Sequence, residues 1–313
     1  MILPFLEQRL RLLPFAVSAR QLLERDAPGG LGQPGVVSAN RHCRLIAARD
    51  GWVALNLARP DDVELIPALT GREGPLWVSL AECAREQGAA EFVARATEFQ
   101  LPVARVGEAE PAVRAAAAAA ARSRSFRLLD LSALWAGPLC AGLLARAGAE
   151  VVRVESVRRP DPTSAVSPRL DRWLNGSKRR IVLDLATTDG RERLREEIAR
   201  CDVLVTSARP AALGRLGLDL EALAARPGLV WAAITAHGWD ADRVGFGDDC
   251  AAAGGLVRWV DGEPRFVGDA LADPLTGLES ALAVMAARAE GRSGRIDLAM
   301  ARVAATYASV LRS

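Results

Sequence analysis

The second half of the chain alternates between short apolar runs and longer amphipathic stretches. Apolar runs with the length of buried strands occupy residues 126–132, 150–156, 179–186, 202–207 and 229–236. Helical patterns fill the intervals most clearly at residues 135–149, 188–201 and 218–228. Strands that alternate with helices in this way predict a parallel sheet covered by helices. We therefore expect an α/β fold with a parallel, Rossmann-like sheet.

Residues 36–107 show a different pattern. Residues 43–58 are predicted as a hairpin, because an Asp-Gly turn at Asp50 and Gly51 joins two strand-like runs. Residues 61–70 and 89–100 have helical spacing, and residues 101–106 form a closing strand. This order of elements predicts a second, smaller α+β domain.

Two further segments complete the expected organisation. Residues 1–35 are predicted as an N-terminal helix followed by a glycine loop, PGGLGQPG. Residues 108–125 are rich in alanine, which suits a helix or a semi-flexible linker equally well. The small domain then occupies residues 36–107, and the large domain occupies residues 126–313.

Composition and charge narrow the class of protein. Half of the 313 residues are apolar and the net charge is only +2, which disfavours a nucleic-acid binder. No apolar run is long enough for a transmembrane helix, and the first residues lack the cleavage pattern of a signal peptide. The five cysteines are scattered without a CxxC pair. We therefore expect a cytoplasmic protein with reduced thiols and without a bound metal, a membrane partner or a nucleic-acid partner.

Ligands of parallel α/β sheets bind beyond the carboxyl ends of the strands. That rule directs attention to residues 132–138, 156–160, 206–210 and 235–239. Basic residues also gather near these strand ends, namely Arg153, Arg158, Arg159, Lys178, Arg179 and Arg180, and Lys178 is the only lysine of the chain. A solvated basic face is the usual role of such a cluster.

One acid stands in a small, apolar stretch, GDALADPLTGL, at residues 268–278. Asp273 precedes Pro274, and Asp followed by Pro is a strong signal for the start of a helix. The residues by themselves therefore favour Asp273 as an N-cap. A helix N-terminus also keeps a carboxylate ionised, so the same residue could act as a nucleophile. Asp269 is the rival acid.

Five segments of the second half resemble one known family. They are LLDLSALWAGPLCAGLLARAGAEVVRVES, WLNGSKRRIVLDL, CDVLVTSARPAALGRLGLDLEAL, LADPLTGLESALAVMAA and GRSGRIDLAM, in that order. Together they resemble the class III CoA-transferases, which include carnitine CoA-transferases, formyl-CoA transferase and α-methylacyl-CoA racemase. The resemblance implies a homodimeric enzyme that moves coenzyme A between an acyl-CoA thioester and a carboxylic acid.

The first half resembles the same family in a different order. The stretch GGLGQPG resembles the glycine loop that covers the family's active site, and residues 36–107 resemble the small domain that follows that loop. Both precede the large-domain motifs here, so the order is circularly permuted. The resemblance implies that Gly29, Gly30 and Gly32 approach the reacting carbonyl and stabilise its oxyanion. An ordinary interdomain linker is the alternative.

The resemblance also assigns roles to individual residues. Asp273 matches the family nucleophile, which attacks the acyl-CoA thioester and forms covalent intermediates. Ser156 replaces an arginine of the formyl-CoA transferase pattern, and Arg158 or Arg159 would substitute for it. The implied contacts with coenzyme A are Leu134, Trp135, Ala136, Arg158, Arg159, Asn175, Lys178, Arg179, Ser207 and Arg215.

Two alternatives stay open at this point. A racemase needs a base on each side of the substrate α-carbon. The family racemases use a histidine where this chain has Asp248, and His237 is the other candidate acid or base. A non-catalytic CoA-binding protein is the second alternative. A nicotinamide-dependent oxidoreductase is weaker, because no GxGxxG follows the first strand of the large domain.

Overall fold

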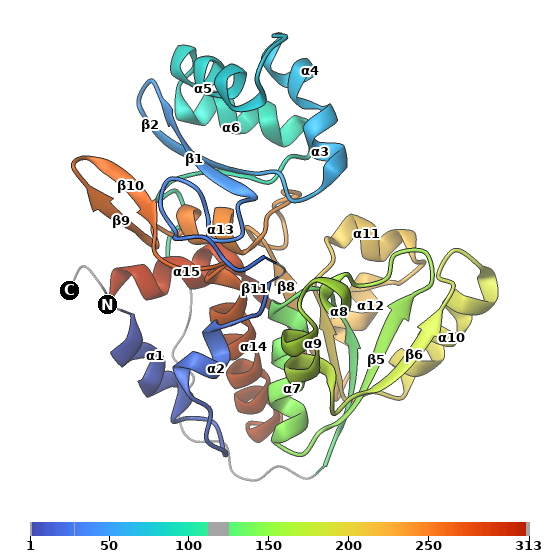
Figure 1. Ribbon diagram of the computed structural model, residues 1–313. Helices are drawn as coiled ribbons and strands as arrows, with labels where there is room; N and C mark the ends of the chain where they lie inside the picture. Colours follow the sequence, from blue (N-terminus) through green and yellow to red (C-terminus); the bar gives the residue numbers. More distant parts are fainter. Residues whose placement is uncertain (1, 28, 112–124, 311–313) are drawn as a thin grey trace. The chain divides into compact units, whose positions relative to one another are not determined.

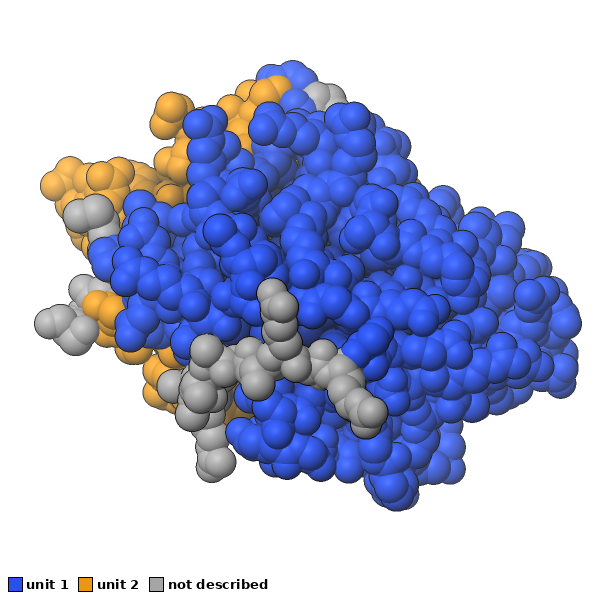
Figure 2. All heavy atoms as spheres, turned by 90° about the horizontal axis from the view of Figure 1, so that it is seen from below, with its two compact units in different colours: residues 1–29, 113–242, 274–299 blue, residues 30–112, 243–273, 300–313 orange. Residues whose placement is uncertain are grey.

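The computed structural model describes residues 2–27, 29–111 and 125–310 (Figure 1). Most of the alanine-rich segment predicted as a helix or linker therefore lies outside the described residues. The chain divides into two compact units, which Figure 2 shows in different colours. Unit 1 comprises residues 1–29, 113–242 and 274–299, and unit 2 comprises residues 30–112, 243–273 and 300–313.

A six-stranded parallel sheet forms the centre of unit 1. Its order is β11 (Gly294–Ala299), β8 (Val230–Thr235), β7 (Val203–Thr206), β4 (Arg127–Leu131), β5 (Glu150–Ser156) and β6 (Arg179–Leu183). The sheet confirms the predicted α/β fold. Because the chain runs outward from β4 in one direction and then from β7 in the other, the topological switch point lies between these two strands.

Helices follow the strands of unit 1. The predicted ones are α7 (Ala136–Arg146), α10 (Thr188–Ala199) and α12 (Leu220–Ala225). The sequence pattern also missed several elements, namely β11, α8 (Thr163–Val166), α9 (Pro168–Asn175) and α11 (Pro210–Arg215). Four of the largest residues of the core against the sheet are Leu129, Leu194, Leu204 and Trp231. Among the described residues, no helix combines the length and apolarity that crossing a membrane requires.

The long helix α14 (Ala272–Ala289) approaches α7 closely along one short stretch. A Cβ at Gly277 would lie 2.7 Å from the carbonyl oxygen of Ala136 and 2.9 Å from the Cβ of Leu139. A side chain at Gly277 would therefore push α14 away from the first turn of α7. This contact fixes α14 next to the loop that follows β4.

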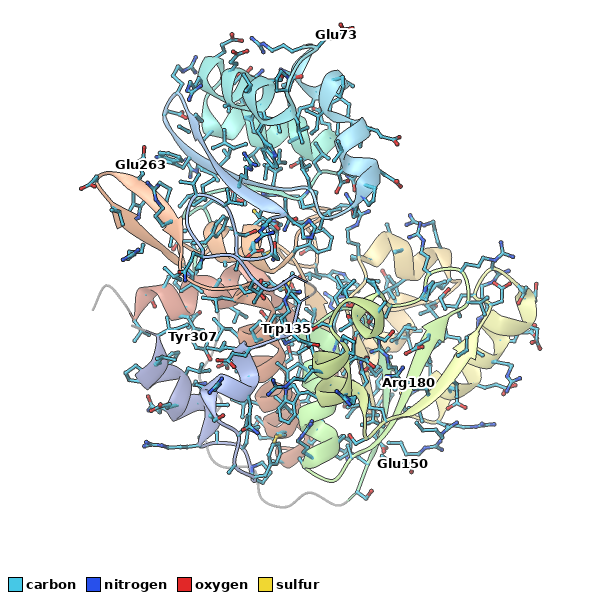
Figure 3. The ribbon with its side chains drawn as sticks, in the orientation of Figure 1. Glu73, Trp135, Glu150, Arg180, Glu263 and Tyr307 are labelled. Carbon is cyan, nitrogen blue, oxygen red and sulfur yellow. The ribbon has the colours of Figure 1, made fainter. Side chains whose placement is uncertain are left out.

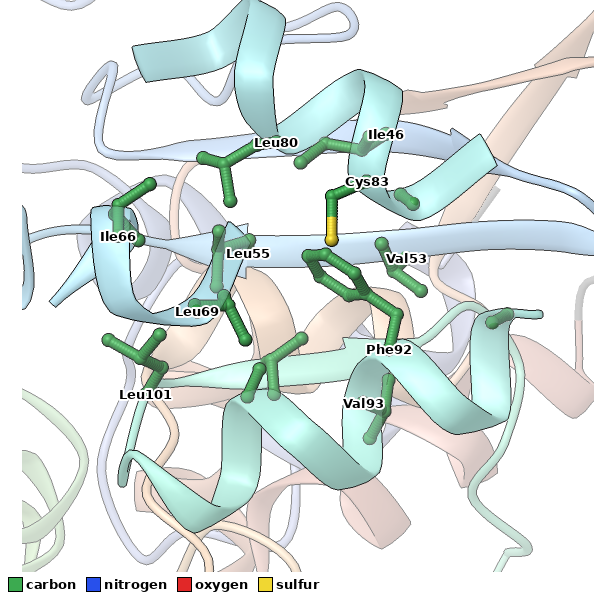
Figure 4. Packing of buried hydrophobic residues seen from close by; sticks show 14 of the residues in the cluster. Ile46, Val53, Leu55, Ile66, Leu69, Leu80, Cys83, Phe92, Val93 and Leu101 are labelled. Carbon is green, nitrogen blue, oxygen red and sulfur yellow. The ribbon is translucent and has the colours of Figure 1, made fainter. Parts of the chain in front are cut away.

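Unit 2 contains a three-stranded antiparallel sheet in the order β1 (Cys43–Ala48), β2 (Gly51–Asn56) and β3 (Val103–Arg105). Its helices are α3 (Pro60–Glu64), α4 (Ile66–Thr70), α5 (Leu76–Glu86) and α6 (Ala89–Glu98). Figure 4 shows the core between this sheet and the helices, with Val53, Leu55, Cys83 and Phe92 in contact. The predicted Asp-Gly turn also caps α6, because Asp50 Oδ1 accepts from the backbone N–H of Ala89 at 2.6 Å.

The two compact units do not coincide with the domains that were predicted from the sequence. Residues 126–313 do not form one continuous domain, since residues 243–273 and the C-terminal segment belong to unit 2. Residues 243–273 contain α13 (Gly247–Ala253), β9 (Val257–Val260) and β10 (Glu263–Phe266), and the C-terminal segment contains α15 (Met300–Ser309). Ala252 and Phe266 pack against Leu45 and Ala54 of the small sheet. An apolar pattern shows that a helix face is buried, but it does not show which sheet buries it.

The N-terminal segment also belongs to unit 1, in which α1 (Leu3–Leu10) and α2 (Ala19–Leu23) are fixed by polar contacts. Arg9 forms a buried, bidentate ion pair with Glu279 of α14, at 2.8 and 2.6 Å. Asp26 caps α9 by accepting from Ser167 Oγ and from the backbone N–H groups of Arg169 and Leu170. Burial acts to raise the pKa of Asp26, but these hydrogen bonds outweigh it and lower the pKa to about 2.

We expect Asp26→Ala to lower the free energy of unfolding by roughly 1–2 kcal/mol at neutral pH, because α9 loses its cap. A carboxyl whose pKa is lowered in the folded state stabilises the protein above its unfolded pKa, here about 3.8, and loses that effect as the pH falls towards about 2. Urea denaturation across this range, with exposed Asp240→Ala as control, measures the difference. Equal pH dependence of Asp26→Ala and the unsubstituted protein would contradict the assignment.

Candidate functional site

The loop between β4 and α7 lies at the switch point of the unit 1 sheet, and its backbone is held by side chains. Three consecutive N–H groups donate to three different residues: Ser132 to Asp130 Oδ1 at 3.1 Å, Ala133 to Ser207 Oγ at 3.0 Å, and Leu134 to Asp161 Oδ2 at 2.9 Å. Ser207 follows β7, so its hydroxyl joins the two strands that flank the switch point. The loop is therefore fixed where ligands of such sheets bind.

Leu134 has an unusual backbone conformation in this loop. Its φ is +66°, a left-handed value that residues other than glycine rarely adopt. Its side chain is 38% exposed, whereas the next residue, Trp135, is buried. Leu134, Trp135, Ala136 and Ser207 thus lie together at one edge of the sheet, and their contact with coenzyme A stays a prediction. Trp135 is labelled in Figure 3.

Asp161, which is not among the residues predicted from the sequence, organises this loop. Its Oδ2 accepts from Leu134 N–H and from Arg153 at 2.6 Å, while its Oδ1 accepts from both the backbone and the hydroxyl of Thr163. The bonds to Thr163 form a local turn, which the order Asp-Pro-Thr signals in the sequence. Its bond to the loop joins residues distant in the chain and has no sequence signal.

Lys178 is buried rather than part of an open basic face. Its Nζ donates to Asp130 Oδ2 at 2.8 Å, to the carbonyl of Pro138 at 2.7 Å and to Asn175 Oδ1 at 2.8 Å. An ammonium has three donors, and all three are used within the protein. Lys178 is therefore a cation that joins β4, α7 and α9, and this geometry gives no support to its predicted contact with phosphate groups.

The charge on Asp130 balances that cation. Burial acts to raise the pKa of Asp130, but the positive charges of Lys178 and Arg153 outweigh it and keep the pKa below its ordinary value. Arg153 is itself buried and bonded to Asp130, Glu155 and Asp161. Two members of the predicted basic cluster are thus structural.

The remaining basic residues named by the sequence are exposed. Arg158 pairs with Asp184 at 3.1 Å, Arg179 lies 3.9 Å from Glu197, and Arg180, which Figure 3 labels, pairs with Asp171 at 2.7 Å. Arg159 and Arg215 are also exposed. Asn175, by contrast, is buried and donates to Asp171.

The glycine loop combines two kinds of position. Gly29 and Gly30 have φ values of +72° and +75°, and a Cβ at either would meet open space. The N–H of Gly32 donates to the carbonyl of Ala39 at 2.8 Å. This N–H is therefore engaged within unit 2, so the structure gives no support to its predicted role as an oxyanion donor.

Two carboxylates and an amide form a compact group in unit 2. Asn40 Nδ2 donates to Asp248 Oδ2 at 2.6 Å and to Asp269 Oδ1 at 3.1 Å. Asp248 Oδ1 also accepts from the backbone N–H of Ala270 at 2.8 Å. Both aspartates are buried. The Oδ1 of Asn40 accepts locally from Ser38 and His42, but its carboxylate partners are more than two hundred residues away, so the sequence gives no signal of them.

Asp273 lies beside this group, in the first turn of α14. The helix begins at Ala272, so Asp273 is its second residue, and the prediction of an N-cap is wrong. The backbone N–H of Asp273 donates to the carbonyl of Ala270, whose φ is +46°. A Cβ at Gly247 would lie 2.3 Å from Asp273 Oδ2, so the carboxylate occupies space that only glycine leaves open.

Of the two predicted candidates for acid or base chemistry, Asp248 belongs to the group around Asn40, and the second is His237. His237 follows β8 in unit 1 and is partly buried. Asp249, next to Asp248, accepts from Phe246 N–H at 2.9 Å and from Asn56 Nδ2 at 3.2 Å. Burial raises the pKa of Asp249 to about 8, against the effect of these hydrogen bonds.

Comparisons with known proteins identify relatives of this chain. CoA-transferase family III matches residues 123–311. Succinyl-CoA–D-citramalate CoA-transferase of Chloroflexus aurantiacus is 33% identical over 184 residues, which are 54% of this chain and 46% of that protein. Formyl-CoA:oxalate CoA-transferase of a Bradyrhizobium strain is 33% identical over 196 residues, 56% of this chain and 45% of that protein. The chain therefore spans less than half the length of these two relatives.

Solved structures extend the similarity to the fold. A hypothetical protein from Mycobacterium tuberculosis matches with a TM-score of 0.54 and 28% identity, over 60% of this chain and 57% of that one. A CaiB/BaiF family protein from Brucella suis matches with a TM-score of 0.50 and 30% identity, over 58% and 53%.

We expect Lys178→Met to lower the free energy of unfolding by about 3–5 kcal/mol, because it leaves a buried carboxylate without its main counter-charge. Arg179→Met, at the exposed neighbouring position, is the matched control and should change the free energy of unfolding by less than about 0.5 kcal/mol. Urea denaturation measures both. The double variant Asp130→Asn/Lys178→Met should lose less than the sum of the single variants, and simple additivity would contradict the pairing.

Asp249 should make the protein less stable as the pH rises. A carboxyl whose pKa is raised in the folded state contributes stability below its unfolded pKa, and this contribution is lost as the pH rises towards about 8. In Asp249→Asn, which keeps the acceptor for Phe246, the decline between about pH 5 and about pH 8 should be smaller. Denaturation curves at several pH values test this, and an unchanged decline would refute the raised pKa.

Proposed function

Because this chain belongs to CoA-transferase family III, as the five sequence segments predicted, we propose that it transfers coenzyme A between an acyl-CoA thioester and a carboxylic acid. The observation that carries the proposal is the placement of Asp273, whose carboxylate lies in the first turn of α14 against Gly247. The relatives named above are CoA-transferases that differ in their acyl groups, so they support the reaction and not a particular substrate.

Asp273 acts as the nucleophile in this proposal. Its carboxylate oxygen attacks the thioester carbonyl, and the carbon–sulfur bond breaks to release the CoA thiolate and leave a mixed anhydride. The thiolate then attacks the Asp273 carbonyl and releases the donor acid, which leaves an aspartyl-CoA thioester. The acceptor carboxylate attacks this thioester, and its carbon–sulfur bond breaks to release the CoA thiolate again and form a second anhydride. The thiolate finally attacks the acceptor's acyl carbon, which yields the new acyl-CoA and regenerates Asp273.

Several local features support this role. The N-terminal turn of a helix stabilises negative charge, so the Asp273 carboxylate is favoured in its ionised, nucleophilic form. Gly247 leaves room for the Asp273 carboxylate itself, because a Cβ at that position would lie 2.3 Å from Asp273 Oδ2. The rival acid, Asp269, is buried and already accepts from Asn40. We therefore assign Asp269 and Asp248 to positioning the turn at Ala270, not to attack.

Coenzyme A would bind at the switch-point loop of unit 1. The N–H groups of Ser132, Ala133 and Leu134 are engaged by side chains, so the loop presents a fixed surface formed by Leu134 and the start of α7. A fixed surface binds the flexible pantetheine arm without an additional cost for ordering the protein. Exposed Arg158, Arg159, Arg179 and Arg215 are available for the phosphate groups.

Asp273→Asn tests the proposal, because asparagine keeps the side-chain size but cannot attack a thioester. We expect CoA exchange to fall by at least roughly a thousandfold, while the free energy of unfolding falls by no more than about 1 kcal/mol. Exchange is measured with labelled coenzyme A and a panel of acyl-CoA donors and carboxylic acids. Mass spectrometry of the unsubstituted protein after incubation with an acyl-CoA should show a covalent adduct on the peptide that contains Asp273.

Asp269→Asn is the matched control, since it removes a carboxylate four residues away and should leave measurable exchange. Near-normal exchange by Asp273→Asn would refute the assignment of the nucleophile. Binding of coenzyme A without exchange by any donor would instead favour a non-catalytic CoA-binding protein.

A further inference from the structure

Asn40 lies in a turn of unit 2, shortly before β1. Its Oδ1 accepts from Ser38 Oγ at 2.8 Å and from the backbone N–H of His42 at 3.0 Å. Ser38 is buried, and its Oγ also accepts from the backbone N–H of Cys43, the first residue of β1, at 3.0 Å. These bonds tie the Asn40 side chain to the start of the strand, so the direction in which its Nδ2 group donates is fixed.

The same amide joins two buried carboxylates. Its Nδ2 donates to Asp248 Oδ2 at 2.6 Å and to Asp269 Oδ1 at 3.1 Å. An asparagine side chain has two N–H donors and a carbonyl oxygen with two lone pairs, and the contacts of Asn40 use all of this capacity. Neither an ionised aspartate, which has no donor, nor a leucine of similar shape could bridge the two carboxylates. The position therefore requires an amide.

One of these carboxylates holds the turn that precedes α14. Asp248 Oδ1 accepts from the N–H of Ala270 at 2.8 Å, and the carbonyl of Ala270 accepts from the N–H of Asp273 at 2.9 Å. Ala270 has a left-handed φ of +46°, which a residue other than glycine keeps only where neighbouring contacts hold it. A Cβ at Gly247 would lie 2.5 Å from the Ala270 carbonyl oxygen, so α13 packs directly against this turn. The contacts of Asn40 thus reach the proposed nucleophile through Asp248 and Ala270.

From this chain of contacts we propose that Asn40 is a positioning residue for the transfer of coenzyme A. It orients Asp248, and Asp248 fixes the turn at Ala270 from which Asp273 enters α14. The inference rests on the proposed function, because Asp273 is the proposed nucleophile. A displacement of a reacting group by about 1 Å can slow a reaction about a hundredfold. Asn40 therefore controls the chemical step without touching the substrate.

Asn40 should affect kcat and not the binding of substrate. Its hydrogen bonds within the described part of the chain all join residues of unit 2, whereas the switch-point loop proposed for coenzyme A belongs to unit 1. We therefore expect substitutions of Asn40 to lower kcat and to change the KM for the acyl-CoA by less than about threefold. A residue needed only for stability would lower the free energy of unfolding and leave the kcat of the folded protein unchanged.

Asn40→Asp tests the bridge, because it keeps the shape of the side chain and replaces the amide by a carboxyl. While ionised, the new carboxyl donates no hydrogen bond and repels Asp248 and Asp269, but once protonated its hydroxyl donates to one of them. Neighbouring carboxylates raise the pKa of a carboxyl. Relative to the unsubstituted protein at each pH, we expect kcat to fall roughly a hundredfold at about pH 8 and to recover about tenfold at about pH 5.5. Exchange of labelled coenzyme A with the fastest acyl-CoA of the donor panel measures kcat.

Asn56→Asp is the matched control. Asn56 is also buried in unit 2 and donates to an aspartate of α13, Asp249, at 3.2 Å, but among the described residues it has no bond to the turn at Ala270. The same replacement of an amide by a carboxyl should therefore change kcat by less than about threefold at either pH.

Hydrogen exchange supplies a second readout, which needs no turnover. The N–H groups of Ala270 and Asp273 are both hydrogen-bonded in the turn. Asn40→Ala removes the bridge without adding a charge, so the peptide that contains these two N–H groups should exchange at least about tenfold faster, while peptides from β2 keep their rate. Mass spectrometry of the full chain measures both.

Faster hydrogen exchange in the turn, together with a loss of kcat that is partly recovered at acid pH, supports the proposal. It is overturned if the folded Asn40 variants keep kcat within about threefold, if kcat of Asn40→Asp falls equally at both pH values, or if hydrogen exchange in the turn is unchanged. Absence of CoA exchange by the unsubstituted protein would overturn the proposed function and this role with it. That failure appears in protein that retains Asn40, so it is distinguishable from a failure of the positioning role alone.

Discussion

The buried ion pair between Asp130 and Lys178 is the interaction on which the switch-point edge of the sheet depends. It joins the end of β4 to the first turn of α7, through the Pro138 carbonyl, and to the end of α9, through Asn175. Two charges removed from water are expensive unless their remaining donors and acceptors are satisfied. Here Ser132 and Arg153 complete the coordination of Asp130, so the pair fixes the geometry of the switch-point loop.

Buried carboxylates are also satisfied by hydrogen bonds in unit 2, where the Asn40 amide donates to both Asp248 and Asp269. Their role is to hold the backbone at Ala270 in its left-handed conformation, through the bond from Ala270 N–H to Asp248. That turn immediately precedes α14 and determines where Asp273 enters the helix. The proposed nucleophile thus follows a strained turn, and buried hydrogen bonds stabilise that turn.

The basic residues near the ends of the strands fall into a buried group and an exposed group. Lys178 and Arg153 are buried and paired with carboxylates of the protein. Exposed positions are instead occupied by Arg158, Arg159, Arg179 and Arg215. Surface ion pairs contribute little to stability and exchange partners readily. Arg158 and Arg179 could therefore exchange their carboxylate partner for a phosphate group, which the buried Lys178 with three acceptors could not do.

The sequence by itself determined the classes of the elements and the family. Alternation of apolar runs with helical spacing specified the parallel sheet, and Asp50-Gly51 specified the hairpin, because both patterns depend on neighbours in the chain. Five segments in order identified the family, and they included the acid, Asp273, for which a role as nucleophile is proposed.

Only the tertiary structure decided which charges are buried and which elements share a core. Lys178 and Arg179 are adjacent in the chain, yet Lys178 is buried and Arg179 is exposed. Lys178 lies in the turn after α9, where Asp130, Pro138 and Asn175 surround its ammonium, whereas Arg179 begins the edge strand β6. Asn40 meets its carboxylates across more than two hundred residues, and residues 243–273 join the small sheet instead of the large one. Local pattern contains no information about such partners, since they are set by packing between distant segments.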